Sequence, residues 1–122
     1  MTYTEGLCKD GWVKKSHTYL PATTAAVQAL GAQIAAARRE LGWSAVDLAS
    51  RLGVSPQLVT RLEKGAPGTA IGTVLEAAVV CGVPLFGVEA AELSSVAART
   101  TDRLALLPAR VRRPTLEVSD DF

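Results

Sequence analysis

The chain has few of the residues that metal centres and catalytic triads use. Among its 122 residues there is one histidine, His17, and there are two cysteines, Cys8 and Cys81, which lie far apart in the sequence. A metal site needs several such ligands at close spacing, and a disulfide scaffold needs more cysteines. No group of glycines has the spacing of a phosphate-binding loop. We therefore expect no metal, no cofactor and no enzymatic activity.

Long apolar runs are also lacking. No stretch approaches the roughly 20 residues that a membrane-spanning helix requires, and residues 1–10 do not resemble a secretory signal peptide. The formal net charge is only +1, so the total charge does not point to a nucleic-acid partner. Hydrophobic residues nevertheless make up 48% of the chain, which is enough to bury the core of one domain. The composition predicts a soluble cytoplasmic protein with one folded domain and tails.

Signals for helix starts and stops are present through the middle of the chain. Apolar residues recur at intervals of three and four, and Ser, Thr, Pro and Gly stand where helices begin or end. The predicted caps and breaks are, in order, Thr23 or Thr24, Gly42, Ser44, Gly53, Ser55, Gly65, Thr69, Gly82 and Pro84. They predict a first helix up to Gly42, short helices over 45–52 and 56–64, a fourth helix ending near Gly82, and a fifth opening at Pro84.

The predicted core and the domain limits follow from the same pattern. The expected buried residues of the last two helices are Ile71, Val74, Leu75, Ala78, Val79, Leu85 and Phe86. Apolar residues at 93, 96, 104 and 107 continue the helical spacing, and residues near Trp12 and over 115–118 have strand-like character. We divide the chain into an N-terminal extension, 1–22, a helical domain, 23–89, and a C-terminal tail, 90–122, which we expect to make dimer or partner contacts.

Two short helices joined by a tight turn form the most informative feature of the sequence. The turn is Gly53-Val54-Ser55, and glycine supplies the positive φ that sets the second helix at a steep angle to the first. The residues expected to be buried between the two helices are Leu48, Ala49, Val54, Val59 and Leu62. This arrangement is the signature of a DNA-binding helix-turn-helix.

This segment resembles the XRE/phage-repressor type of helix-turn-helix. The resemblance rests on the runs LGWS at 41–44, DLA at 47–49 and LGVSPQLVTRLEKG at 52–65, and it covers roughly residues 28–88. It implies an all-α fold, a five-helix XRE/phage-repressor-like domain with an N-terminal extension and a helical or extended C-terminal tail. It also implies a homodimer on double-stranded operator DNA, and by analogy we expect Leu85, Phe86 and Val88 at the dimer surface.

The resemblance assigns DNA contacts to the helix over 56–64 and to its surroundings. Gln57 suits adenine, and Arg61 suits guanine or a phosphate. The expected base contacts are Pro56, Gln57, Thr60 and Arg61, and the expected phosphate contacts are Ser44, Ser55, Leu58, Lys64 and Thr69. The alternative is that these are ordinary solvated helix residues. One departure from the family is Ala45, where glutamine is common, since alanine cannot brace a phosphate.

Two further residues have a structural assignment. Arg38 and Glu63 correspond to a partly buried ion pair of phage-repressor-type domains, and we expect Glu63 to hold Arg38 without either side chain reading bases. Breaking such a pair should cost stability, because the remaining charge is left without a partner.

The tail adds a narrower resemblance, to small antitoxin regulators of the HipB kind. It rests on PGTAIGT at 67–73, LPARVRR at 107–113 and DDF at 120–122, and it implies a HipA-type kinase toxin as a partner. The expected partner contacts are Arg110, Arg112, Arg113 and Phe122. The alternatives are that the basic run touches DNA flanks or is only solvated, and that the acidic end is a frayed terminus.

Charge bears on how tightly the chain would bind DNA. Lys and Arg balance Asp and Glu over 23–89, whereas residues 99–113 carry five arginines against one aspartate. A neutral domain predicts modest monomer affinity and a need for dimerisation. We predict a sequence-specific transcriptional repressor, in its narrower form an antitoxin-type autoregulator. The alternatives are a regulator without a toxin and an interaction module that has lost DNA binding.

Overall fold

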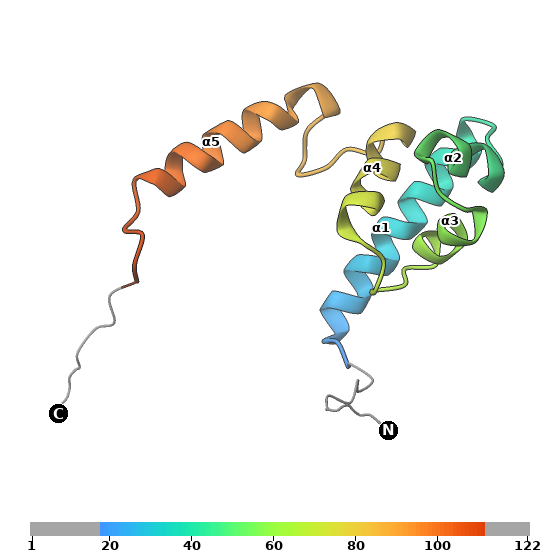
Figure 1. Cartoon of the computed structure of the whole chain (residues 1–122), viewed down its shortest axis with the longest axis horizontal. Helices are drawn as coiled ribbons and strands as arrows, with labels where there is room; N and C mark the ends of the chain where they lie inside the picture. Colours follow the sequence, from blue (N-terminus) through green and yellow to red (C-terminus); the bar gives the residue numbers. More distant parts are fainter. Residues whose placement is uncertain (1–17, 112–122) are drawn as a thin grey trace. The chain divides into compact units, whose positions relative to one another are not determined.

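The computed structural model describes residues 18–111, and all of its regular structure there is helical. The helices are α1 (Pro21–Glu40), α2 (Ala45–Leu52), α3 (Pro56–Glu63), α4 (Ile71–Cys81) and α5 (Leu93–Ala105), with a short 3-10 helix, η1 (Ala90–Glu92), before α5 (Figure 1). This confirms the predicted all-α class. The strand-like segments expected near residues 12 and 115 lie outside the described part of the chain.

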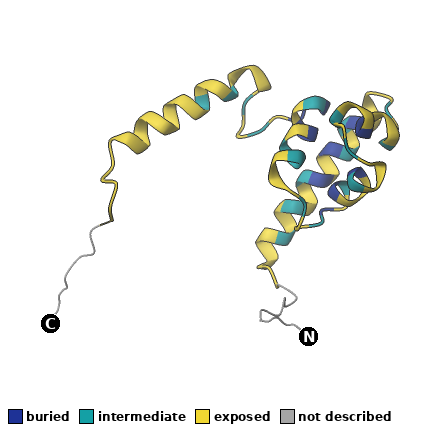
Figure 2. Ribbon diagram, viewed as in Figure 1, coloured by how far each residue is buried: buried dark blue, intermediate teal, exposed yellow. Residues whose placement is uncertain are grey.

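The chain divides into two units, Met1–Cys81 and Gly82–Phe122. In the first unit α1 packs against α3 and α4, and α2 packs against the same two helices. The fully or almost fully buried apolar residues of this unit are Ile34, Leu48, Ala49, Val59, Leu62, Ala77, Ala78 and Cys81. Figure 2 shows segments coloured as buried within this group of helices. The first unit is therefore a four-helix core in which the short helices α2 and α3 are held by α1 and α4.

The first helix begins earlier than its threonines predict. Pro21 occupies the first turn of α1, and the preceding Leu20 is extended and serves as N-cap without a side-chain hydrogen bond. Proline at the start of a helix has a suitable φ, and its missing N–H has no partner there to lose. The predicted cap at Thr23 or Thr24 is therefore wrong, because both residues lie inside the first turn.

The fourth helix also differs from its prediction. It begins at Ile71, and the hydroxyl of Thr69 donates to the carbonyl of Ala66 at 2.9 Å instead of capping the helix. Ile71 is 75% exposed and Val79 is 42% exposed. The prediction was misled by the high apolar content of this helix, which has apolar residues on more than one face. Its buried residues are alanines and Cys81, which allow α4 to lie close to its neighbours.

No helix starts at Pro84. Leu85 and Val88 exchange two backbone hydrogen bonds across a tight turn whose central residues, Phe86 and Gly87, both have positive φ. Two positive φ values are typical of a hairpin turn and incompatible with a right-handed helix. Phe86 is 78% exposed, so it is not a core residue as predicted, and Leu85 is half-buried. The fifth helix is instead α5, further along the chain.

Glycine permits a close approach between α1 and the end of α3. A Cβ atom built on Gly31 would lie 2.5 Å from the carbonyl oxygen of Leu62 and 2.7 Å from that of Glu63. On the other side, a Cβ atom on Gly65 would lie 2.7 Å from the Cα atom of Gln28. Only hydrogen fits at both positions, so main-chain atoms set the separation of the two helices here.

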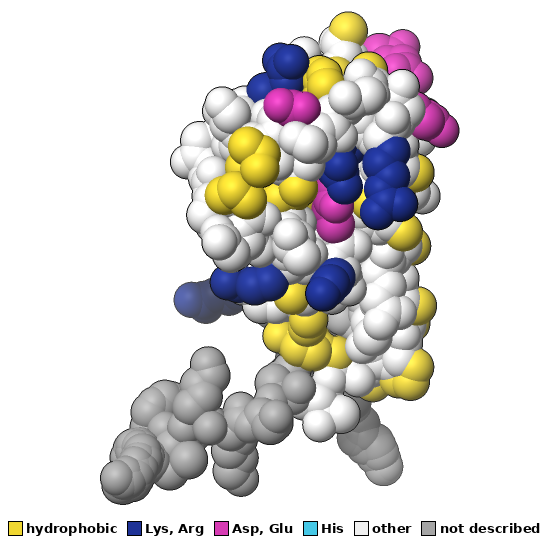
Figure 3. All heavy atoms as spheres, turned by 90° about the vertical axis from the view of Figure 1, so that its right-hand side faces the viewer, with side chains coloured by type: hydrophobic (Ala, Val, Ile, Leu, Met, Phe, Trp, Pro, Cys, Tyr) yellow, Lys and Arg dark blue, Asp and Glu magenta, His cyan; other side chains and the backbone are white. Residues whose placement is uncertain are grey.

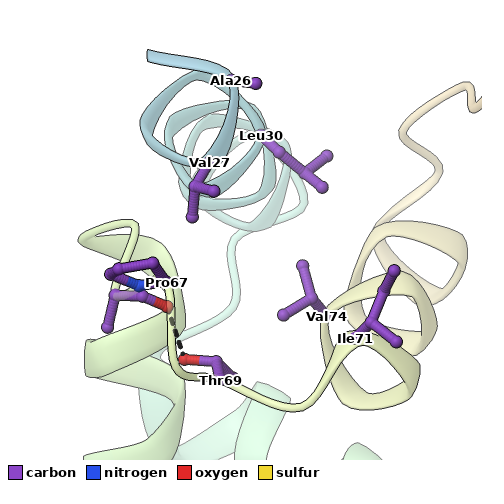
Figure 4. A pocket seen from close by; sticks show the side chains of 8 residues that line it. Ala26, Val27, Leu30, Pro67, Thr69, Ile71 and Val74 are labelled. Atoms are coloured by element: carbon purple, nitrogen blue, oxygen red, sulfur yellow. Dashed lines mark hydrogen bonds between the residues drawn. The ribbon is translucent and has the colours of Figure 1, made fainter. Parts of the chain in front are cut away.

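An apolar groove of about 270 Å³ opens between α1 and α4. In Figure 4, Leu30 of α1 and Val74 of α4 point toward each other across it. The lining residues are Ala26, Val27, Leu30, Ala66, Pro67, Thr69, Ile71 and Val74. The groove accounts for the exposure of Ile71, which lies along this opening and not in the core.

Candidate nucleic-acid interface

The α2–turn–α3 segment is fixed by caps at each junction. Ser44 and Asp47 form a capping box, in which each side chain accepts a hydrogen bond from the backbone N–H of the other. Gly53 ends α2 in the left-handed conformation, with φ of 71°. Ser55 then begins α3 by accepting a hydrogen bond from the N–H of Leu58, and Pro56 follows in the first turn. These local signals set where each short helix starts and stops.

One face of α3 is buried and the opposite face is open. Val59 and Leu62 are almost completely buried, whereas Gln57, Arg61 and Lys64 are exposed. The three exposed residues are spaced by four and three positions, so they share one side of the helix. The polar face of α3 is thus free to meet a partner along its whole length.

The other residues expected at the DNA differ in how far their polar groups are already engaged. The hydroxyl of Thr60 donates to the carbonyl of Pro56 at 3.1 Å, which leaves its methyl group free to make contacts. The N–H of Leu58 donates to Ser55, so it is not free for a phosphate. Thr69 is half-buried with its hydroxyl bound to Ala66.

The N-terminus of α2 already has an anionic group. The Asp47 carboxylate accepts the N–H of Ser44 at 2.8 Å, and these hydrogen bonds hold the pKa of Asp47 below its ordinary value. A phosphate at this helix end would meet that carboxylate. Ser44 accepts a hydrogen bond from Asp47 through its hydroxyl oxygen, and the hydroxyl proton remains available for donation.

The structure brings Arg38 and Glu63 together beneath the end of α3. The Arg38 guanidinium donates from Nε to Oε2 of Glu63 at 2.6 Å and from Nη2 to Oε1 at 3.0 Å. Its Nη1 donates to the carbonyl oxygen of Trp43 at 2.8 Å. The bond to Glu63 raises the pKa of Arg38. The Arg38 side chain therefore joins α1 to the α1–α2 loop and to the C-terminal end of α3. These hydrogen bonds hold α3 in its orientation.

A model of the helix-turn-helix domain family matches residues 29–93, more than half of the chain. The chain belongs to the helix-turn-helix domain family. Comparisons with curated proteins and with solved structures found no match. Membership of this family indicates DNA binding.

The helix-turn-helix domain contains contacts that the sequence analysis missed. The guanidinium carbon of Arg51 lies 4.0 Å from the centre of the Trp43 ring, a cation–π contact between α2 and the loop before it. Gly31 provides the close approach to α3 described above. Trp43 lies directly after Gly42 and eight residues before Arg51, and this pairing of an aromatic residue with an arginine could have predicted the cation–π contact. Gly31 stands alone among the alanines of α1, and a glycine at such a position could have predicted the close approach to α3.

A free thiol lies close to the ion pair. Cys81, at the end of α4, is buried, and burial together with the charge of Glu63 raises the pKa of its thiol. A thiol with a raised pKa is neutral at physiological pH and a poor nucleophile. Cys81 therefore behaves as a small core residue of the helix-turn-helix domain.

Positive and negative side chains are mixed on the face of the molecule that Figure 3 shows. In Figure 3, Lys and Arg side chains lie in several separate places with Asp and Glu side chains among them. Arg110 is exposed near the end of the described chain, and Arg112, Arg113 and Phe122 lie outside the described residues. Within residues 18–111, no cluster of potential ligands could hold a metal ion, and no helix is long and apolar enough to cross a membrane.

Proposed function

We propose that this protein is a sequence-specific transcriptional repressor that binds operator DNA as a homodimer, with α3 as the reading helix. Its family supports DNA binding. The observation that carries the proposal is the open polar face of α3, formed by Gln57, Arg61 and Lys64 opposite a fully buried apolar face. An exposed Gln and Arg one turn apart on a helix held this firmly suit the edges of base pairs in the major groove.

The residues have different roles in this proposal. The Gln57 amide pairs with adenine, and Arg61 pairs with guanine or a phosphate. The Thr60 methyl group, beside Pro56, packs against a thymine methyl. Lys64 at the end of α3 and the hydroxyls of Ser44 and Ser55 are proposed to donate to the phosphate backbone, whereas Thr69, whose hydroxyl already donates to Ala66, would need to release that hydrogen bond to do so. The N–H of Leu58 donates to the hydroxyl oxygen of Ser55 and so stabilises the N-terminal end of α3, which is proposed to lie near the phosphates.

Charge explains why the proposal includes two copies. The described part of the first unit carries five Lys and Arg residues against four Asp and Glu residues. Phosphate neutralisation supplies much of the affinity of DNA-binding proteins, so a single copy should bind weakly. Ala45 offers no side-chain hydrogen bond near the phosphates. Two copies on a two-fold symmetric DNA site would make twice as many contacts with the DNA. The affinity of the dimer for this site would therefore exceed that of a single copy.

The experiment begins with selection of binding sites by the full chain from a library of random duplexes, beside a duplex from its own promoter. Binding of the best sequences is then measured at two salt concentrations. The double variant Gln57→Ala, Arg61→Ala should weaken specific binding by at least about 30-fold. The matched control is Gln33→Ala, Arg39→Ala, which removes the same two residue types from exposed positions on α1 and should bind almost normally.

The outcomes separate the proposal from its main alternative. Enrichment of one sequence, with binding that the α3 variant loses and the α1 variant keeps, supports the repressor. Failure to enrich any sequence would overturn it and favour an interaction module that has lost DNA binding. Equal loss in the two variants would mean that charge alone, and not α3, accounts for the binding.

A narrower form of the proposal is an antitoxin-type autoregulator that also binds a HipA-like kinase toxin. Its support is the sequence similarity at 67–73 and in the tail, with Arg110, Arg112, Arg113 and Phe122 as the proposed partner contacts. If a kinase-type gene adjoins this one, its product should co-purify with the full chain and be lost on deletion of residues 108–122. Unchanged co-purification would place the contact elsewhere, and no co-purification would leave a regulator without a toxin.

A further inference from the structure

In the second unit, taken by itself, helix α5 has a largely apolar stripe along one side. On α5 the stripe consists of Leu93, Val96, Thr100 and Leu104, and Leu107 follows at the same spacing just beyond the end of the helix. Leu104 is 65% exposed and Leu107 is 58% exposed, while Leu93 and Val96 are half-buried. The other described helix of this unit is the three-residue η1, which is too short to cover the stripe. A 13-residue helix is marginally stable alone in water, so this stripe calls for a partner.

The charges beside the stripe differ at its two ends. Glu92 directly precedes α5, and Arg103 lies in its last turn. The two are 11 residues apart, which is about three helical turns, so they lie along the same flank of the stripe. Arg99 lies further round toward solvent, and Asp102 is on the side away from the stripe. One flank is therefore acidic at its beginning and basic at its end.

This polarity matches a second α5 that runs in the opposite direction. In an antiparallel pair the same flank of both helices meets on one side, so each Glu92 would lie beside Arg103 of the other copy. Centring the overlap between residues 97 and 98 also places Leu93 of one copy between Thr100 and Leu104 of the other. In a parallel pair the flank would face Ser94 and Thr101, which carry no charge. The pattern thus favours an antiparallel pair.

We propose that α5 is a self-association helix, which pairs antiparallel with α5 of a second copy of this chain. This deepens the proposed function and rests on it, because a two-fold operator requires a defined dimer. A stripe along a 13-residue helix buries less surface than a standard protein interface. Self-association in solution is therefore weak, and the two copies are held together more firmly when both contact DNA.

The test measures the full chain without DNA by sedimentation equilibrium, from about 10 to about 300 µM. The variant Leu104→Glu should raise the dissociation constant of the dimer at least about ten-fold, because it places a charge in the seam. The matched control Ala98→Glu puts the same charge on an exposed position away from the stripe and should leave the constant almost unchanged.

A charge exchange tests the direction of pairing. Glu92→Arg and Arg103→Glu should each weaken self-association, since each variant places like charges side by side. An equimolar mixture of the two variants should associate again, because every contact is then between opposite charges. This rescue also excludes unfolding of α5 as the cause of the losses, since unfolded helices would not associate when mixed.

Three results would each overturn the proposal. They are a monomer over the whole concentration range, a dimer that Leu104→Glu leaves intact, and a mixture without rescue. Because no DNA is present, none of these results depends on whether Gln57 and Arg61 read bases. Conversely, a chain that dimerises as expected but fails to select any sequence would overturn the proposed repressor and leave this inference standing.

Discussion

Replacing Arg38 with methionine should destabilise the first unit by about 3 kcal/mol. Arg38 makes three hydrogen bonds, two to the Glu63 carboxylate and one to the carbonyl of Trp43. The two charged side chains are only 10% and 11% exposed. Methionine replaces much of the volume of arginine but donates no hydrogen bond. Glu63 would therefore keep its charge in a largely buried position, and the Trp43 carbonyl would lose its partner.

The magnitude follows from this burial. Removing one member of a buried ion pair costs about 3–5 kcal/mol, and the residual solvent access of Glu63 places this pair at the lower end. For a domain of this size each kcal/mol lowers Tm by roughly 4–8 °C, so Tm should fall by about 12–24 °C. Urea unfolding followed by circular dichroism gives the free energy. The control is Arg39→Met, the exposed neighbour in α1, which should cost less than about 0.5 kcal/mol.

A double variant separates the ion pair from simple packing. Adding Glu63→Met to Arg38→Met should recover part of the lost stability, because no unpaired charge then remains beneath α3. If the Arg38→Met change costs less than about 1 kcal/mol, or if the two changes are additive, the pair does not act as reasoned here.

Two further predictions concern α1 and α2. Gly31→Ala should cost about 2 kcal/mol of folding stability, because the added methyl group would meet carbonyl oxygens of α3. The control Gly68→Ala, with open space around it, should be nearly neutral. Similar urea midpoints for the two variants would contradict this prediction. Asp47→Asn should remove a contribution that depends on pH. Because the Ser44 N–H holds the pKa of Asp47 below 3.8, that contribution is complete above about pH 4 and is lost as pH falls through the lowered value. Thermal unfolding of wild type and variant between about pH 6 and about pH 2 checks it, and a difference that persists at the acid end would refute it.

The sequence predicted best those features that local chemistry decides. The starts of α2 and α3 follow from serine caps, and the turn between them follows from Gly53, so the family could be inferred before any packing was known. The contact between Arg38 and Glu63, 25 residues apart, is not a local feature. It was inferred from resemblance to a family, because no periodicity relates two residues on different helices.

The failures came from competing signals of similar strength. Two threonines suggested a cap for α1, but Pro21 begins the helix and the N-cap is Leu20, three to four residues earlier. α4 is apolar on several sides, so its pattern did not distinguish the buried alanines from the exposed Ile71. Past Pro84 the apolar residues suggested a helix, whereas positive φ values at Phe86 and Gly87 form a turn. Such backbone conformations are common for glycine but rare for phenylalanine, and composition did not reveal this one.

The close approach at Gly31 and Gly65 bears on how a domain of this kind could acquire a new target. Because main-chain atoms on α1 and at the end of α3 approach so closely there, no side chain at this contact sets the distance between the two helices. The side chains at Gln57, Thr60 and Arg61 are exposed and are not among the atoms at that contact. They can be exchanged without moving the helix that carries them. The scaffold and the recognition surface can therefore change independently during evolution, and new specificities can be selected at these three positions while the glycines stay fixed.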